Sequence, residues 1–189
     1  GAIALDGVDG TRLRVAQRRA GGLAFVPADR DHEGACLPAS LAENLVAGRQ
    51  RRPEFSELGF LRWGAIGRWA EDVLQRFDVR GGGPRAAAAS LSGGNLQRVV
   101  VARELGETPR LLVAAHPTRG VDVRGIAFIH ERLAAAREAG AAVLLISSEL
   151  DELLTLAGRL LVVYDGRIVA ERTTATPDEL GALMTGVAA

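Results

Sequence analysis

Short apolar runs mark the strands that we expect in this chain. They lie at residues 23–26, 111–114, 143–146 and 160–164. Each run is almost continuously apolar, which is typical of strands in a parallel sheet whose two faces are both covered. Asp165 and Gly166 follow the last run, and an Asp-Gly pair before a further apolar stretch is a strong hairpin signal. The pattern predicts a mainly parallel sheet that ends in an antiparallel edge hairpin.

Helical periodicity fills the stretches between these runs. Apolar residues recur every three or four positions over residues 126–136 and over 150–157, as on the buried side of a helix. Ser40 and Thr176 each precede a glutamate by three positions, which is the capping box that begins a helix. Because strands and helices alternate along the chain, we expect an α/β fold.

The longest interval between strands carries no strand pattern. It contains helical patterns at residues 40–48 and 66–77 and a Gly-rich connector that returns the chain to the sheet. We therefore expect an α/β core at residues 1–34 and 90–189, with an inserted helical subdomain at residues 35–89.

The two tryptophans both fall in this inserted segment. Trp69 belongs to the apolar stripe of the second helical pattern, so we expect it to pack inside the subdomain. The position of Trp63 fits either core packing or contact with a membrane partner, and the pattern does not decide between them.

Composition then narrows the function classes. The 23 acidic residues balance the 23 basic ones, which argues against a nucleic-acid partner. The apolar runs are shorter than the roughly 20 residues of a membrane-spanning helix. The single Cys36 excludes an internal disulfide, and no charged segment leading into an apolar stretch opens the chain, so we expect a cytosolic setting. His32, His116 and His130 lack metal-ligand spacing, so no metal site is expected.

The chain contains no lysine, because all 23 of its basic residues are arginine. An arginine-rich composition of the whole proteome explains this without any functional reason. The chemical consequence holds in either case. This chain cannot by itself supply the phosphate-binding lysine of a P-loop or a Schiff-base lysine.

A glycine-rich loop with hydroxyl and amide side chains precedes a helical pattern at residues 96–105. It reads Ser92, Gly93, Gly94 and Asn95, with Asn95 as the expected N-cap. Two glycines allow a ligand to approach the backbone closely, and a helix N-terminus attracts negative charge, so the loop fits an anion such as phosphate. Many ordinary helices also begin in this way, and the loop alone does not separate the two interpretations.

A second motif, at residues 111–123, favours the functional interpretation of the glycine-rich loop. Residues 111–123 combine an apolar strand with a His-Pro-Thr-Arg-Gly-Val-Asp sequence, and together with residues 91–98 they resemble the ATP-binding subunits of ABC transporters. In that resemblance, Ser92 begins the signature motif, the 111–116 strand is the Walker B strand, and Asp122 is the D-loop aspartate. Residues 25–30 resemble the Q-loop strand and residues 145–151 the switch strand.

The resemblance implies a P-loop NTPase core of the ABC ATPase type and a set of nucleotide contacts. These contacts are Ser92, Gly93, Gly94, Asn95, Gln97 and Asp122. The family's P-loop stands before the segment that resembles residues 1–7, so the resemblance implies a chain that starts after the P-loop. Residues 7–11 could be a degenerate P-loop, but no lysine follows them, and their spacing favours a turn between two strands.

Four positions depart from the family's active site. Ala115 replaces a carboxylate that helps to hold magnesium, and His116 replaces the catalytic glutamate. An imidazole can act as a base, but His116 without its neighbouring carboxylate fits a packed or solvated side chain better. Ser148 replaces the switch histidine and Ala28 the Q-loop glutamine. We therefore expect no catalytic residue and no metal ligand in this half.

The resemblance implies the second nucleotide-binding half of a tandem importer ATPase. Such a half would complete the ATP site of the other half, with ATP and Mg²⁺ in the intact tandem dimer and neither bound tightly by this chain alone. Its partners would be the other half and, through the helical subdomain, membrane permeases, with a substrate-binding protein reached indirectly. It would lie on the cytoplasmic face of the plasma membrane.

The cargo and one rival function stay open. Ala115, His116 and residues 125–131 resemble the nucleoside-type branch, and a sugar such as ribose, xylose or galactose is the alternative. A regulatory or adaptor domain that keeps the fold without using nucleotide is a further hypothesis, which the intact residues 92–95 disfavour.

Overall fold

A computed structural model describes residues 1–5 and 7–186 of the chain. Asp6 and residues 187–189, which fall inside the predicted core ranges, lie outside the described residues. The chain divides into two compact units, Gly1–Leu144 and Leu145–Ala189. This division differs from the boundaries expected at residues 34 and 90, and the helical segment lies in the first unit together with the sheet. The predicted subdomain boundaries remain a prediction.

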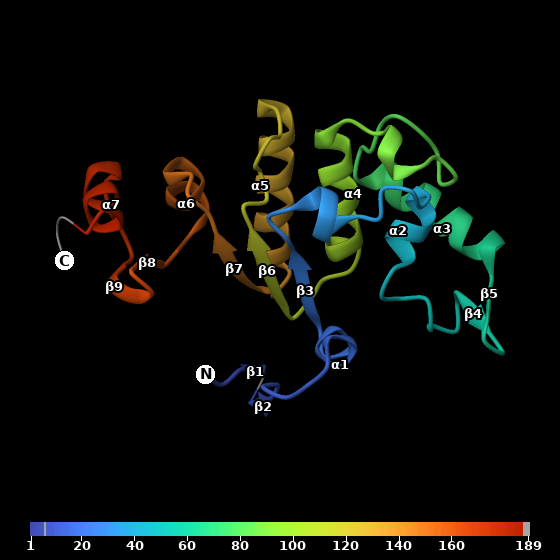
Figure 1. Ribbon diagram of the computed structural model, residues 1–189, viewed down its shortest axis with the longest axis horizontal. Coiled ribbons are helices and arrows are strands. Elements are labelled where there is room, and N and C mark those ends of the chain that lie inside the picture. The colour runs from blue at the N-terminus through green and yellow to red at the C-terminus, as the bar shows by residue number, and fades with distance from the viewer. Residues whose placement is uncertain (6, 187–189) are drawn as a thin grey trace. The chain divides into compact units, whose positions relative to one another are not determined.

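The main sheet contains three of the predicted strands. They are β3 (Leu23–Val26), β6 (Leu111–Ala115) and β7 (Ala142–Ile146), in the order β3-β6-β7 (Figure 1). Strands β3 and β6 are parallel, with Val26 opposite Ala114. The predicted parallel α/β sheet is confirmed.

The sheet is covered on one face more completely than on the other. Ala24, Val26 and Leu112 are buried, whereas Phe25, which points to the opposite face, is 40% exposed, and its partner Val113 is half-buried. The expectation of two covered faces is therefore wrong for the described residues. Continuously apolar strands do not reveal which face finds a helix to pack against.

Two helices stand beside this sheet, α4 (Gly93–Leu105) and α5 (Val123–Glu138) (Figure 1). They bury Val99, Val100, Ile129 and Leu133, each at most 3% exposed. Helix α4 begins three residues earlier than the apolar pattern indicates, because its first turn is formed by two glycines and Asn95 and has no apolar member.

The inserted segment folds mainly as expected. It contains α2 (Leu41–Val46), α3 (Trp63–Arg76) and a 3₁₀ turn η2 (Ala88–Ser90). The capping box of α2 is confirmed, since the Glu43 amide donates to Ser40 Oγ at 3.2 Å and the Ser40 amide donates to the Glu43 carboxylate at 2.7 Å. Trp69 packs on Phe55, with ring centroids 4.8 Å apart, as predicted.

Five short elements were not assigned from the sequence. The antiparallel pair β1 (Ala4–Leu5) and β2 (Val8–Asp9) is followed by α1 (Val15–Ala20), and a second hairpin joins β4 (Ser56–Glu57) to β5 (Phe60–Leu61). The segment expected as a simple turn at residues 7–11 thus contains strand β2. Elements of two to six residues are too short to show a periodicity.

The second unit holds α6 (Leu150–Leu156), β8 (Leu160–Tyr164), β9 (Arg167–Arg172) and α7 (Pro177–Met184). Strands β8 and β9 are antiparallel, and Asp165 and Gly166 both have positive φ, at 46° and 72°, as a type I′ turn requires. Their apolar face packs against α7 through Leu180 and Leu183. The hairpin is confirmed. It forms a separate two-stranded sheet, so its place at the edge of the main sheet remains a prediction.

Among the described residues, no helix is long and apolar enough to span a membrane. The same residues hold no cluster of three or more His, Cys, Asp or Glu side chains that could ligate a metal.

Candidate functional site

The candidate site of the first unit lies at the carboxyl ends of β3 and β6. Because these strands are parallel and Val26 is opposite Ala114, Ala28 follows one strand at the same edge at which Ala115 and His116 end the other. Ala28 is exposed, and Ala115 and His116 are half-buried. Ligands of open α/β sheets bind at this edge.

The N-terminus of α4 contributes a turn of free backbone donors. Ser92 is the N-cap in place of the expected Asn95, and its side chain caps no backbone amide in the described chain. Its Oγ instead accepts a hydrogen bond from Asn95 Nδ2 at 3.0 Å, while Asn95 Oδ1 accepts one from the Arg80 amide at 2.7 Å. The first amides of α4 therefore remain available to an anion, and Asn95 orients the serine hydroxyl.

Arg30 links three loops at this site, and the sequence analysis did not identify it. Its guanidinium donates to the Arg119 carbonyl at 2.8 Å and lies at 3.4 Å from the Gly120 carbonyl. A Cβ on Gly93 would clash with Arg30 Nη2, so the absence of a side chain at Gly93 makes room for the guanidinium. The one sequence signal was an arginine two residues after the Q-loop position at Ala28.

Arg30 also brings positive charge to the signature loop. Its side chain is 20% exposed, and its buried Nε lies 4.0 Å from Asp31 Oδ1 but has no hydrogen-bond partner among the described residues. A guanidinium with an unused donor, next to free helix amides, is suited to a phosphate oxygen.

Gln97 and Asp122 hold the neighbouring loops in place. Gln97 is 3% exposed, and its Nε2 donates to the Pro117 carbonyl at 2.7 Å, which ties α4 to the loop after β6. Asp122 Oδ1 accepts the Gly125 amide at 2.7 Å and caps α5. Gln97 therefore holds the loop after β6 against α4, and the expected contact of Gln97 with nucleotide remains a prediction.

His116 adopts a backbone conformation that favours glycine. Its φ is +45°, and its carbonyl accepts the Arg119 amide at 3.1 Å, so the chain turns sharply as it leaves β6. The turn directs the loop from Pro117 to Asp122 back toward α4. The position is therefore constrained by backbone geometry as well as by side-chain chemistry.

Ser148 lies in the second unit, in the exposed loop between β7 and α6. In this loop the Glu149 amide donates to Ser147 Oγ at 3.0 Å. Neither serine carries a ring nitrogen, so the loop lacks the imidazole of a switch histidine.

This edge of the sheet has groups that can bind an anion, but it lacks the catalytic groups that the resemblance implies. Helix amides and Arg30 can bind a phosphate oxygen. Ala115 has no side-chain oxygen that could bind a metal, and Ala28 has no side-chain amide. The arrangement can bind part of an anionic ligand, but it lacks the carboxylates that would hold magnesium and activate water.

No family model matches the chain. It is 42% identical over 188 residues to the nucleoside import ATP-binding protein NupA of Lactococcus lactis, covering 98% of this chain and 37% of that protein. The guanosine import ATP-binding protein NupO of Bacillus subtilis is 38% identical over 98% of this chain and 37% of its own length. The glucose import ATP-binding protein TsgD13 of Haloferax volcanii is 40% identical over 98% and 34%, respectively. The chain spans little more than a third of these relatives.

The fold is also similar to solved structures. One is the dimeric post-hydrolysis state of the ATP-binding cassette MJ0796 bound to ADP and Pi, with a TM-score of 0.75 and 19% identity over 93% of this chain and 74% of that chain. The fold is therefore that of an ABC ATPase cassette. The chain's homologues are ATP-binding proteins of ABC importers for nucleosides and sugars, and it corresponds to one segment of them.

Proposed function

We propose that this chain is part of the second nucleotide-binding half of an ABC importer ATPase, and that it completes the ATP site of the other half. The observation that supports this most directly is the open N-terminus of α4, where Ser92 leaves the helix amides uncapped and Gly93 makes room for Arg30. These groups can contact the phosphates of a nucleotide held by another half.

The same proposal assigns no hydrolysis to this half. Ala115 and His116 provide no carboxylate, so the residues present do not fit a magnesium ion at this edge. Ala28 lacks the amide of the Q-loop glutamine, and Ser148 has a hydroxyl in place of the imidazole of the switch histidine. The metal that accompanies ATP would be held by the other half, and this chain would contribute phosphate contacts alone.

The test is the variant Ser92→Arg in the full-length protein, because a large cation at the N-cap would block the helix amides. We expect ATPase activity to fall by about 100-fold or more, the typical effect of losing a preorganised transition-state contact. Ser90→Arg is the matched control, since Ser90 is exposed and its hydroxyl donates to the Ala87 carbonyl outside the loop. We expect Ser90→Arg to retain activity.

The same pair of variants tests the rival function. A regulatory or adaptor domain would retain all ATPase activity in the Ser92→Arg protein, because it would not contact nucleotide. Equal activities of the two serine variants would therefore reject the proposed role of α4.

The proposed membrane partner is a permease bound at the hairpin β4–β5. Leu58, Phe60 and Trp63 are 95%, 80% and 51% exposed, so three large apolar side chains stand in solvent within six residues. Clustered exposed apolar side chains are typical of a protein contact. We propose that this hairpin holds the chain to the cytoplasmic face of the membrane, and that a substrate-binding protein acts through the permease.

The proposed cargo is a nucleoside, with a sugar as the alternative. The support is the similarity to NupA and NupO, whose names state nucleoside and guanosine import, while the similar identity to the glucose protein TsgD13 keeps the sugar class open. Uptake by the intact transporter distinguishes them. Import of radiolabelled guanosine supports the proposal, and import of ribose or glucose without any nucleoside would contradict it.

A further inference from the structure

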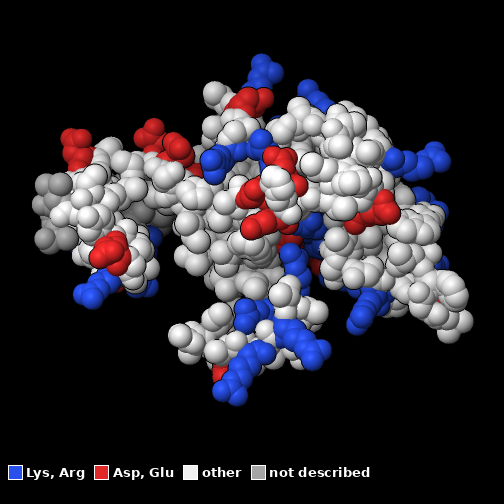
Figure 2. Space-filling view, in the orientation of Figure 1, with Lys and Arg blue, Asp and Glu red and all other residues white. Residues whose placement is uncertain are grey.

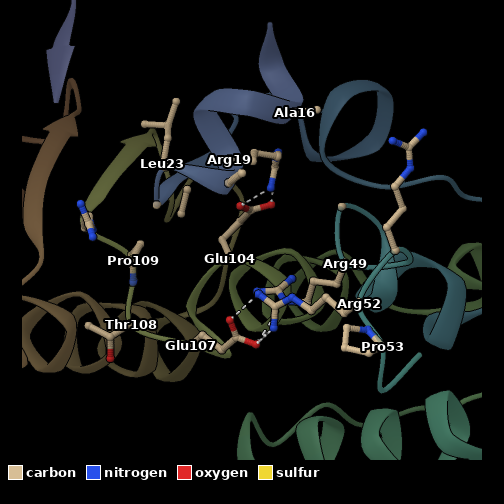
Figure 3. A pocket seen from close by; sticks show the side chains of 17 residues that line it. Ala16, Arg19, Leu23, Arg49, Arg52, Pro53, Glu104, Glu107, Thr108 and Pro109 are labelled. Atoms are coloured by element: carbon tan, nitrogen blue, oxygen red, sulfur yellow. Dashed lines mark hydrogen bonds and ion pairs between the residues drawn. The ribbon is translucent and has the colours of Figure 1, made fainter. Parts of the chain in front are cut away.

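A cavity of about 610 Å³ lies in the first unit, at the opposite end of the strands from the candidate site. Its walls come from α1, the loop that follows α2, the C-terminal end of α4 and the residues that lead into β3 and β6 (Figure 3). Gly22 and Leu23 line it where β3 begins, and Pro109 and Arg110 line it just before β6. The volume is in the range of small-ligand sites.

The lining of this cavity is strongly basic, although the whole chain is neutral. The charged residues are Arg19, Arg49, Arg51, Arg52, Arg110, Glu104 and Glu107. Arg19, Arg49, Arg51 and Arg52 alone provide four guanidinium groups beside two carboxylates. Both carboxylates are already bound by arginine, so they leave positive charge in excess.

Glu104 is fully occupied by groups of the protein. Its side chain is 1% exposed and accepts hydrogen bonds from both terminal nitrogens of Arg19, at 3.0 and 3.1 Å, and from Arg103 Nε at 2.8 Å. The Phe25 amide also donates to it, at 3.2 Å. This carboxylate joins α1, β3 and α4 and has little capacity for a further cation.

Glu107 neutralises one arginine well and a second one poorly. Arg52 donates to both of its oxygens, with Nη2 at 2.7 Å from Oε2 (Figure 3). Arg49 approaches the same carboxylate, with its Nε 3.7 Å from Oε1, beyond hydrogen-bond distance.

Arg49 is therefore a buried cation with incomplete pairing. Its side chain is 12% exposed, and its buried Nε has no hydrogen-bond partner among the described residues. Burial lowers the pKa of Arg49, with Glu107 opposing the shift, but an arginine stays charged. An anion in the cavity beside this guanidinium would add the counter-charge that Glu107 supplies only in part.

We propose that this cavity binds a small phosphate-bearing anion with two or more negative charges. Guanidinium groups form bidentate hydrogen bonds with phosphate oxygens, and several guanidinium groups line this one cavity. Figure 2 shows basic side chains gathered over the segment that carries α1, where residues 12–19 include Arg12, Arg14, Arg18 and Arg19. This surrounding charge attracts anions toward the cavity.

The experiment is calorimetric titration of the full chain with pyrophosphate at low ionic strength, with citrate as a carboxylate of comparable charge. We expect pyrophosphate to bind, and citrate to bind more weakly. Arg49→Gln and the exposed Arg51→Gln should each weaken pyrophosphate binding by about tenfold, because a hydrogen bond to a charged group contributes on the order of 1.5–3 kcal/mol. Arg68→Gln, an exposed arginine on α3 outside the cavity, is the matched control and should change the affinity less than twofold.

Two further variants distinguish anion binding in the cavity from a purely structural ion-pair cluster and from binding at α4. Glu107→Gln removes negative charge from the lining and should strengthen pyrophosphate binding, an effect that an ion-pair cluster without a ligand would not produce. In Ser92→Arg, in which the proposed phosphate contact at the N-terminus of α4 is blocked, the cavity should still bind pyrophosphate and Arg49→Gln should still weaken that binding, because the N-terminus of α4 lies outside the cavity. The proposal is rejected if wild-type chain binds no pyrophosphate, if citrate binds as tightly, if Arg49→Gln and Arg51→Gln have no effect, or if Ser92→Arg abolishes binding. Only this last result would place the anion at the proposed nucleotide contact.

Discussion

At the scale of single residues, the shape of the candidate site depends on glycines that leave room for neighbouring side chains and on one residue with a left-handed backbone conformation. At Gly93 the Arg30 guanidinium occupies the space of the missing Cβ, so a larger residue would displace it, and at Gly125 a Cβ would clash with Val121 Cγ1. His116 differs from these glycines, because it has a Cβ and yet adopts a positive φ. The loop after β6 therefore carries backbone strain where related ATPases are expected to place a catalytic carboxylate.

This strain leads to a stability prediction for His116→Gly. A left-handed conformation costs an L-residue about 1–2 kcal/mol, while glycine adds roughly 0.5–1 kcal/mol of unfolded-state entropy. We expect the free energy of unfolding to stay equal or to rise by up to about 1 kcal/mol, measured by urea denaturation. Ala135→Gly, at an exposed position in the last turn of α5, is the control and should lose up to about 1 kcal/mol. A large loss in His116→Gly would show that the imidazole itself contributes packing.

At the scale of elements, the short hairpin β4–β5 has an exposed residue, Leu58, that the stability of the hairpin does not explain. Leu58 has a φ of +50° and Gly59 one of +86°, so two positive-φ residues form the turn. Asparagine or glycine is preferred at the first of these positions, and a leucine there is 95% exposed. Neither turn geometry nor core packing explains this leucine, which is why we assign the hairpin to a partner.

For Leu58→Asn we predict unchanged stability together with weaker binding to the permease. The turn should become equally or slightly more stable, because asparagine tolerates positive φ, so the melting temperature should not fall. The amount of permease that copurifies with the full-length protein should decrease several-fold, and so should the rate of substrate uptake. Val15→Asn, which removes a side chain that is 70% exposed from α1, should affect neither quantity. Unchanged permease recovery in Leu58→Asn would exclude the hairpin as the contact.

At the scale of the whole first unit, Glu104 connects elements that lie far apart in the sequence. It is bound by Arg19 from α1 and by the Phe25 amide from β3, which are 85 and 79 residues away. Burial raises the pKa of this carboxyl, but the hydrogen bond from Arg19 and the charges of Arg103 and Arg19 outweigh it, so the net pKa is lowered. A lowered pKa in the folded state means that stability depends on the ionised form.

The pH dependence follows from this sign. The contribution of Glu104 should be complete above the usual glutamate pKa of 4.5 and should be lost as the pH falls below it through the lower, folded-state value. Glu104→Gln should cost about 3–5 kcal/mol at neutral pH, because it leaves buried guanidinium groups without their counter-charge, and it should flatten the acid limb of the stability curve. Denaturant titrations from pH 3 to pH 7 measure both effects. The exposed Glu138→Gln should retain the wild-type curve, and an unchanged acid limb in Glu104→Gln would contradict this assignment.

The sequence by itself determined the elements that depend on local patterns. Strands at residues 23–26 and 160–164, the Asp165-Gly166 turn and the capping boxes at Ser40 and Thr176 follow from periodicity, turn chemistry and caps, each of which acts within a few residues. The glycine-rich loop at residues 92–95 was also visible as a local motif, whereas the missing carboxylates at Ala115 and His116 follow only from the resemblance to ABC ATPases.

Tertiary structure decided everything that joins distant residues. Arg30 meets Arg119 across 89 positions, and the burial of Gln97 depends on Pro117, 20 residues away. The basic cavity and the open face of the sheet likewise exist only once separate elements pack together. No local pattern encodes these contacts, because the free energy of each depends on what surrounds it in the folded chain.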